Sequence, residues 1–187
     1  TLASLAFMTE LAISAYAKIN LTLEVVRRLA SGYHELRTVL QQVDLHDDVV
    51  LADTQDDAIC LTCDNPALPG NHTNLAWRAA ETIRRRCGVQ RGVRIHLAKR
   101  IPIGGGLAGG SADAAAVLRG LSRLWQLDLP EDALLSLGTE LGMDVPFCIL
   151  GGTALGTGRG DSLERLPPLP ATPVVIADPG VSVSTAE

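Results

Sequence analysis

Aromatic residues and basic charge are both scarce in this chain of 187 residues. Phe, Trp and Tyr together make up 3% of it, and 16 Lys and Arg stand against 21 Asp and Glu, so the formal net charge is -5. Proteins that bind nucleic acids need a basic surface, and those that bind single strands add stacking aromatic rings. We therefore expect no nucleic-acid partner.

Long apolar runs and paired metal-binding motifs are missing as well. No apolar stretch approaches the roughly 20 residues of a membrane helix, and the apolar residues 1–15 lack the Lys or Arg that opens a signal peptide. Cys60 and Cys63 have metal-type spacing, but no second pair completes a zinc site, and a strand would place the two thiols on opposite faces. We expect a soluble, cytoplasmic protein with no membrane partner and no protein-bound metal cluster.

The sequence does contain enough apolar residues for a core, with 47% hydrophobic and 20% charged residues. β-forming residues dominate the first third of the chain, where we expect strands over residues 11–26, 36–45, 48–52 and 58–63. Helical spacing and capping residues then predict helices over residues 74–87, from 111 to about 125, and from 130 to 138 or 142.

The remaining segments predict short strands, over residues 93–97, 147–150, 153–157 and 174–177. Gly151 and Gly152 are expected to join the second and third of these in a hairpin. Because strands and helices do not alternate regularly along the chain, the predicted fold class is α+β.

A glycine-rich segment, Pro102-Ile-Gly-Gly-Gly-Leu-Ala-Gly-Gly-Ser111, lies between a predicted strand and a predicted helix. Five glycines and one alanine within seven positions leave room for backbone N–H groups to surround an anion, and the following helix directs its positive dipole end at the same place. We interpret the segment as a polyphosphate-binding loop; a glycine-rich turn without a ligand is the alternative. The candidate ATP-binding residues here are Pro102, Gly104, Gly105, Gly106, Leu107, Ala108, Gly109, Gly110 and Ser111.

Other glycine loops fit this segment less well. Gly104, Gly106 and Gly109 match the dinucleotide pattern G-x-G-x-x-G, but the next helix leads into another helix and not into a strand that ends in an acid. A Walker loop would continue with Gly-Lys-Ser or Gly-Lys-Thr, and a protein-kinase loop needs a lysine downstream, whereas no lysine follows Lys99.

Only two lysines occur in the chain, Lys18 and Lys99. Lys18 lies inside an apolar strand pattern, where a compact positive charge suits a phosphate or a catalytic carboxylate; a strand lysine that faces water is the alternative. Asp144 lies among apolar residues, and carboxylates are rarely buried without a partner. Paired with Lys18, Asp144 could orient or deprotonate a hydroxyl; an Asp in an exposed turn is the alternative.

These segments resemble the signatures of the GHMP kinases, the superfamily of galactokinase, homoserine kinase, mevalonate kinase and phosphomevalonate kinase. The glycine loop resembles their phosphate-binding motif. Further segments are similar to the branch that phosphorylates a cytidine-diphosphate-linked methylerythritol, and together the matches extend from about residue 13 to residue 185. These segments are Ala17-Lys-Ile-Asn-Leu21, Gly32-Tyr-His-Glu-Leu36, Gly142-Met-Asp-Val-Pro-Phe147, and Gly151-Gly-Thr-Ala-Leu155 with Gly158-Arg-Gly160.

The resemblance implies a fold and a reaction. The fold is the two-layer α+β N-terminal domain of these kinases, similar to the second domain of ribosomal protein S5. The reaction is ATP-dependent phosphorylation of the 2-hydroxyl of 4-(cytidine 5'-diphospho)-2-C-methyl-D-erythritol, a step of the non-mevalonate isoprenoid pathway, with Mg²⁺ between the ATP phosphates. Another GHMP small-molecule kinase and a non-catalytic domain that binds nucleotide or RNA remain as alternatives.

The resemblance also implies roles for single residues. Asp144 becomes the catalytic base, and Lys18 holds it ionised and close to the phosphate. The cytidine end of the substrate is assigned to Asn20, Tyr33 and His34, and the adenosine end of ATP to Asn74 and Lys99. The sequence departs from the usual family residues at three positions. Ala108 and Ala112 replace a Gly and a Ser with small residues, although Ala112 removes a hydroxyl that could contact phosphate or metal. Met143 stands where a smaller residue is usual, which changes the packing beside Asp144.

A division of the chain follows from the same resemblance. Residues 1–12 are expected to be an extension or an early strand, and residues 13–170 the ATP-binding domain. Residues 171–187 are expected to cross to a second, ferredoxin-like domain that this chain does not include. The oligomeric state does not follow from the sequence.

Overall fold

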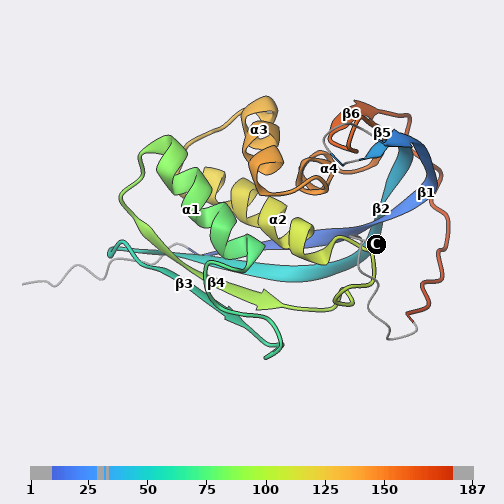
Figure 1. Cartoon of the computed structure of the whole chain (residues 1–187). Helices are drawn as coiled ribbons and strands as arrows, with labels where there is room; N and C mark the ends of the chain where they lie inside the picture. The colour runs from blue at the N-terminus through green and yellow to red at the C-terminus, as the bar shows by residue number, and fades with distance from the viewer. Residues whose placement is uncertain (1–9, 29–31, 33, 179–187) are drawn as a thin grey trace, which may run out of the picture.

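The computed structural model describes residues 10–28, 32 and 34–178, which form a six-stranded sheet with its helices on one side (Figure 1). The strands follow the order β3-β4-β2-β5-β6, and β1 pairs with β2 alone. All neighbouring strands are antiparallel except β3 and β4. The strands are β1 (Glu10–Arg28), β2 (His34–Thr54), β3 (Ile59–Cys63), β4 (Gly92–Ala98), β5 (Thr153–Thr157) and β6 (Ser162–Arg165), and the helices are α1 (Leu75–Cys87), α2 (Gly109–Leu124), α3 (Glu131–Leu141) and α4 (Val145–Leu150). The predicted α+β sandwich is confirmed.

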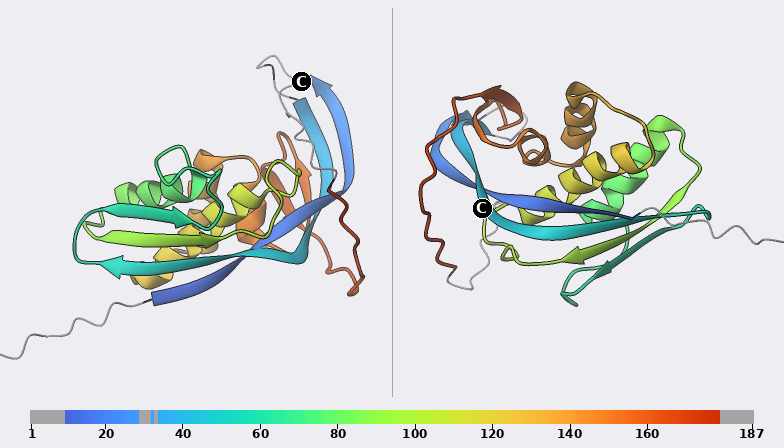
Figure 2. Two further views of the ribbon diagram at one scale, coloured as in Figure 1. Left: turned by 90° about the horizontal axis from the view of Figure 1, so that it is seen from below. Right: turned by 180° about the vertical axis from the view of Figure 1, so that it is seen from behind.

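The long pair of strands β1 and β2 connects two parts of the sheet. The two strands predicted over residues 36–45 and 48–52 are in fact one strand of 21 residues, which pairs with β4 over Asp48–Thr54 and with β5 over Thr38–Gln41. Three register shifts along β1 bend the pair, as β-bulges do. Figure 2 shows the result: the pair leaves the flat part of the sheet under the helices and rises beside β5 and β6.

Alanine and glycine bring α2 close to the sheet. Residues 114 to 118 of α2 are all fully buried, and a side chain at Gly120 would collide with Leu51 of β2 and Ile13 of β1. Small side chains on the helix face therefore let the branched residues of the sheet fill the space between the layers. This core holds the start of α2, and with it the glycine loop, at a fixed height above the strands.

Capping residues explain the agreement between predicted and observed helix ends. Asn74 caps α1 by accepting the N–H of Ala76, and Gly88 ends that helix in a left-handed conformation. α3 begins after Pro130 and ends at Leu141, so the later of its two predicted ends is correct. α2 begins at Gly109, two residues before the predicted start, because its first turn needs no side chains to form.

Two strand predictions are wrong. Residues 147–150 belong to α4, which carries Pro146 in its first turn and ends at Gly151 with a φ of 68°, so there is no hairpin with residues 153–157. An apolar run this short has no measurable period, and both Phe147 and Ile149 are buried, as they would be in a central strand. Residues 174–177 form no strand, and Val175 remains 94% exposed.

Two further observations bear on the sequence predictions. β1 begins at Glu10, so the end of the range predicted as an extension or an early strand is a strand. None of the helices within the described part of the chain is long and apolar enough to cross a membrane.

Candidate active site

A cleft of about 440 Å³ lies beside the glycine loop. It collects side chains from β1, from the start of α1, from the end of β4 and from the turn before α4, all of which meet at the start of α2. Every predicted ATP-binding residue and both predicted catalytic residues line it. These residues are Lys18, Asn74, Lys99, Pro102, Gly104, Gly105, Gly106, Leu107, Ala108, Gly109, Gly110, Ser111 and Asp144.

The loop itself has the backbone conformation of an anion cradle. Gly104 and Gly106 have φ values of 75° and 72°, and Ala108, the residue before α2, has a φ of 59°. Left-handed residues at these positions turn successive N–H groups toward the cleft side. Ala108 pays a steric cost there that the glycine usual in the family would avoid. At Gly109 a side chain would meet Ile101 at 3.0 Å, so the loop packs tightly on its strand side.

Lys18 lies at the mouth of the cleft and connects several elements. Its Nζ is 3.7 Å from a carboxylate oxygen of Asp144 and donates a hydrogen bond of 2.9 Å to Oδ1 of Asn20. Asn20 in turn donates to Thr38, which donates to the carbonyl oxygen of Thr22. The backbone N–H of Lys18 donates to the carbonyl oxygen of Leu107, so β1 is tied directly to the glycine loop.

Asp144 is paired as predicted, but it is not buried. Its side chain is 44% exposed, whereas that of Lys18 is 9% exposed. The residue stands directly before α4 and makes no capping hydrogen bond to that helix. A carboxylate with one cationic partner and one open side is placed to accept a hydrogen bond from a group that enters the cleft.

The side chain of Lys99 lies between two buried carboxylates. Its Nζ contacts Asp113 at 2.6 Å and Asp47 at 2.5 Å, and all three side chains are at most 5% exposed. Asp47 also accepts the backbone N–H groups of Arg100 and Ile101. Lys99 lines the cleft while its ammonium contacts both carboxylates, and its place at the adenosine end of a nucleotide stays a prediction.

The charges of this buried cluster do not balance, since two carboxylates share one ammonium. Burial raises the pKa of Asp113 to about 7, although the charge of Lys99 opposes the shift. Burial lowers the pKa of Lys99, but the two carboxylates outweigh it and raise that pKa above its usual value. Oδ1 of Asp113 is buried and has no hydrogen-bond partner among the described residues. Asp113 is also one of the residues that line the cleft.

Sequence reasoning missed both Asp47 and Asp113. A usable signal existed for Asp113, which interrupts a run of alanines on the buried face of α2; Asp47 lies among other polar residues of its strand and has no such signal. A charged residue at such a position needs a partner of opposite sign, and Lys99 was one of only two lysines available.

The remaining predicted residues lie in other places. Asn74 lines the cleft, but its side chain caps α1 and also donates to the carbonyl oxygen of Pro69. Asn20 and His34 are exposed on the β1–β2 pair and do not line the cleft, although Asn20 reaches it through Lys18. Tyr33 lies outside the described residues.

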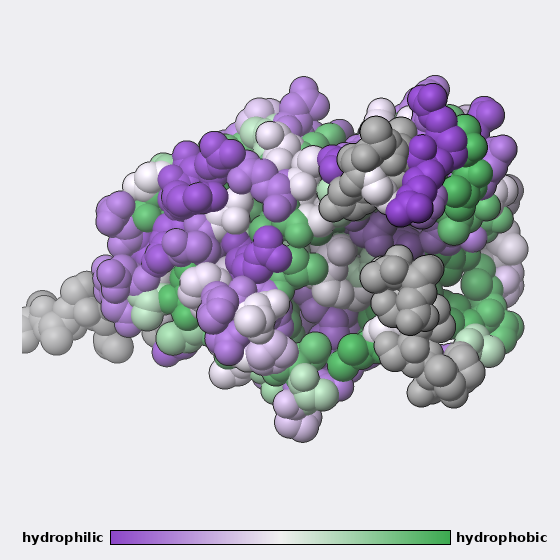
Figure 3. Space-filling model, in the orientation of Figure 1, coloured by the Kyte–Doolittle hydropathy of each residue, from purple (hydrophilic) through white to green (hydrophobic). Residues whose placement is uncertain are grey.

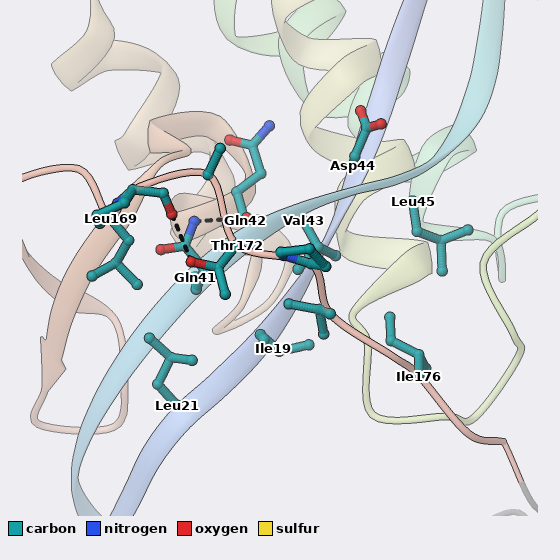
Figure 4. Close-up of a pocket in the computed structure, with 14 residues that line it drawn as sticks. Ile19, Leu21, Gln41, Gln42, Val43, Asp44, Leu45, Leu169, Thr172 and Ile176 are labelled. Atoms are coloured by element: carbon teal, nitrogen blue, oxygen red, sulfur yellow. Dashed lines mark hydrogen bonds between the residues drawn. The ribbon is translucent and has the colours of Figure 1, made fainter.

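A second hollow, of about 550 Å³, lies between the middle of β1 and β2 and residues 169–176 (Figure 4). Its wall is largely apolar, and its polar side chains bond to the protein: Gln41 bonds to Thr153 and Gln42, and Thr172 bonds to Pro170. Apolar residues 21, 23, 25 and 26 continue this surface along β1, each about half exposed, as the green area over the β1–β2 pair in Figure 3 shows. The groups capable of chemistry are concentrated at the glycine loop instead.

Comparison with known proteins agrees with the geometry. Residues 74–152, which include the loop, α2 and Asp144, match the family model of the GHMP kinases N terminal domain. Residues 74–152 thus resemble a GHMP kinase N-terminal domain in sequence and in fold. The matched residues include the glycine loop and Asp144. Lys18 and Asn20, on β1, lie before the matched range.

Relatives with curated names extend the match over nearly the whole chain. The 4-diphosphocytidyl-2-C-methyl-D-erythritol kinase of Caldicellulosiruptor saccharolyticus is 49% identical over 173 residues, and the enzyme of the same name from Bacillus subtilis is 46% identical over 173 residues. Each alignment covers 92% of this chain and 60% of the relative, so the chain spans about three fifths of the length of these GHMP kinases.

Solved structures show the same relationship. A crystal structure of 4-(cytidine 5'-diphospho)-2C-methyl-D-erythritol kinase superposes with a TM-score of 0.70 at 40% identity, covering 83% of this chain and 55% of the other. The mevalonate kinase of Methanococcus jannaschii superposes with a TM-score of 0.66 at 16% identity over 85% of this chain and 56% of its own. The second comparison establishes only the shared GHMP fold.

Proposed function

We propose that this chain is the ATP-binding part of an enzyme that phosphorylates the 2-hydroxyl of 4-diphosphocytidyl-2-C-methyl-D-erythritol. The observation that carries the proposal is the ion pair of Lys18 and Asp144 in the same cleft as the glycine loop. Phosphoryl transfer needs little more from a protein than a phosphate cradle and a group that positions the accepting hydroxyl. The choice of substrate rests on the names of the relatives that are 46–49% identical to this chain.

In the proposed mechanism the loop binds the phosphates of ATP through its backbone N–H groups and the positive end of α2. Asp144 accepts the hydrogen bond of the attacking hydroxyl and takes its proton as the new P–O bond forms. Lys18, 3.7 Å from Asp144, offers its ammonium to the transferred phosphoryl group, which carries negative charge throughout the step. Asn20 fixes the position of that ammonium from the other side.

The residues present fit a magnesium ion. Mg²⁺ in kinases is held by phosphate oxygens, water and one or two carboxylates. Asp113, whose Oδ1 has no partner among the described residues, and Ser111 both line the cleft. Bound there, the ion would neutralise the charge of the ATP phosphates. We propose Asp113 and Ser111 as its protein contacts.

We assign the cytidine end of the substrate to Asn20, Tyr33 and His34, on the β1–β2 side of the cleft. The support is the position of Asn20 beside Lys18, which directs the accepting molecule toward the outer half of these strands. Stacking on Tyr33 would suit any base, whereas hydrogen bonds from His34 could distinguish cytosine. ATP and a nucleotide-linked substrate both suit a cytoplasmic enzyme whose partners are small molecules and not membranes or nucleic acids.

The test is a phosphotransfer assay on the natural protein that contains this chain. With labelled ATP, we expect transfer to the cytidylated methylerythritol and at most trace transfer to mevalonate or to the uridine analogue. Preferred transfer to mevalonate would favour another GHMP kinase. An absence of transfer to all three acceptors, with ATP still bound in equilibrium dialysis, would leave a nucleotide-binding domain without the proposed activity.

A further inference from the structure

A third hollow lies at the open edge of β1, remote from the glycine loop. It measures about 280 Å³ and is lined by Ala12, Ile13, Ser14 and Tyr16 of β1 and by Arg119 and Arg123 of α2. None of these residues lines the ATP cleft. Since α2 rises about 1.5 Å per residue, the two arginines stand about 15 to 21 Å along the helix from its start at Gly109.

The two arginines are cations without a counter-ion. Neither side chain makes an ion pair or a hydrogen bond with any described residue, and Nε of Arg119 is completely buried without a partner. Burial, together with the nearby charge of Arg123, lowers the pKa of Arg119. A guanidinium still keeps its proton at any ordinary pH, so the uncompensated charge remains in the protein. Burying such a group without an acceptor is costly.

The acids closest in the sheet are already engaged. Asp48 and Asp47 of β2 stand opposite Ser14 and Ala15, but Asp48 pairs with Arg100 and His46, and Asp47 pairs with Lys99. The other titratable groups near Arg119 are the hydroxyl of Tyr16 and the thiol of Cys148. Burial raises the pKa of that thiol to about 12, so it stays uncharged.

The strand side of the hollow offers hydrogen-bond donors as well. Within the described residues β1 pairs only with β2, so its outer edge presents unpaired backbone N–H groups. The hydroxyls of Ser14 and Tyr16 make no hydrogen bond to a described residue, and Tyr16 is steadied by the ring of His46 at a centroid distance of 5.1 Å. Donors from a helix and a strand thus surround a space that contains two positive charges and no carboxylate.

We propose that this hollow, the β1-edge pocket, binds a divalent phosphate: inorganic phosphate or a small phosphomonoester. Two uncompensated guanidinium groups match the charge of about −2 on such a group near neutral pH. The planar fork of an arginine binds phosphate oxygens in pairs, and both arginines line the hollow. The size of the pocket, slightly below that of typical ligand sites, suits a compact anion and excludes a nucleotide.

The test measures binding of labelled inorganic phosphate to the natural protein by equilibrium dialysis, with saturating AMP-PNP present to occupy the glycine loop. We expect bound phosphate in the wild type. Arg119→Met, which keeps the length of the side chain, should weaken that binding about tenfold or more, and Arg123→Gln should weaken it as well. Arg85→Gln, a change at an exposed arginine of α1, serves as the matched control and should have no effect.

Each outcome decides the proposal. Equal phosphate binding by the wild type and both variants, or no binding by the wild type up to about ten millimolar, would overturn it. If succinate binds more tightly than phosphate and competes with it, the pocket takes dicarboxylates and the phosphate assignment is wrong. Because Arg119 is partly buried, circular dichroism checks the fold of its variant, and the exposed Arg123 keeps the test decisive should that variant unfold.

Discussion

Both lysines of the chain line the same cleft, but their carboxylate partners differ in number and in exposure. The ammonium of Lys99 contacts two carboxylates that are as buried as itself. Lys18 has one carboxylate partner at 3.7 Å, and that partner is nearly half exposed. A charge that is fully surrounded holds structure in place, whereas a charge with an open side remains available to a ligand. On this comparison we propose that Lys99 supports the loop and that Lys18 takes part in the chemistry.

The largest effect should follow the removal of the enclosed lysine. Lys99→Met leaves two buried carboxylates without a cation, and breaking a buried pair in this way costs about 3–5 kcal/mol. We expect a loss of that order in the free energy of unfolding, measured by urea denaturation. Lys18→Met is the matched variant and should cost less than about 1 kcal/mol, because water can hydrate Asp144 after the change. Equal losses in the free energy of unfolding for the two variants would show that Lys99 stabilises the fold no more than Lys18 does.

The pair of Lys18 and Asp144, whose loss should cost little stability, should matter most for the rate of phosphoryl transfer. Asp144→Asn should lower kcat by at least ~100-fold with little change in the Kd for ATP, since losses of this size are common for a general base. Steady-state kinetics on the natural protein with the cytidylated substrate measure the change. Glu131→Gln, at an exposed acid paired with Arg165, is the control and should leave kcat unaltered. A kcat within a few-fold of wild type would remove Asp144 from the mechanism.

The pairing of Lys18 with Asp144 makes a further prediction about their combined loss. Lys18→Met should also reduce kcat, and the double variant with Asp144→Asn should be no slower than the worse single variant. Residues that act as one unit lose their function once, so their effects do not add. Additive losses in log kcat would mean that the two side chains act separately in spite of the 3.7 Å between them.

The smallest expected effect is a pH dependence of stability that arises from the buried cluster of Lys99, Asp47 and Asp113. Burial is the main cause that raises the pKa of Asp113 from its usual acidic range to about 7. A carboxyl with a raised pKa in the folded state stabilises the fold fully below pH 4, and this contribution is lost as pH rises to 7. We expect the free energy of unfolding of the wild type to decline over that window more steeply than that of Asp113→Asn. Parallel pH profiles from urea denaturation would show that Lys99 keeps Asp113 ionised throughout.

Local signals in the sequence account for the correct predictions. Asn74 and Gly88 mark the ends of α1 by capping, and the glycine loop needs only its own residues and the helix after it. The segment 147–150 was misassigned because six apolar residues fit a buried strand as well as a short helix. Residues 174–177 have strand-like composition, but composition does not supply a neighbouring strand.

The contacts of the candidate site also divide into those that the sequence predicts and those that depend on packing. Asp144 and Lys18 were expected to meet although 126 positions separate them, and that expectation needed the family resemblance in addition to the rule that a carboxylate seeks a cation. Asp47 and Lys99 are 52 positions apart in the sequence, and no local sequence pattern predicts their contact. The pocket beside Arg119 depends on where α2 crosses β1, which follows from packing and not from spacing.

The hydrogen bond from the N–H of Lys18 to the carbonyl oxygen of Leu107 has a mechanical consequence. It fastens the strand that carries Lys18 to the glycine loop, so the two can part only if this bond breaks. Any widening of the loop to admit ATP must either pull β1 with it or release that amide to solvent. The amide of Lys18 is therefore a natural reporter of the loop's opening, visible to hydrogen exchange without any added label.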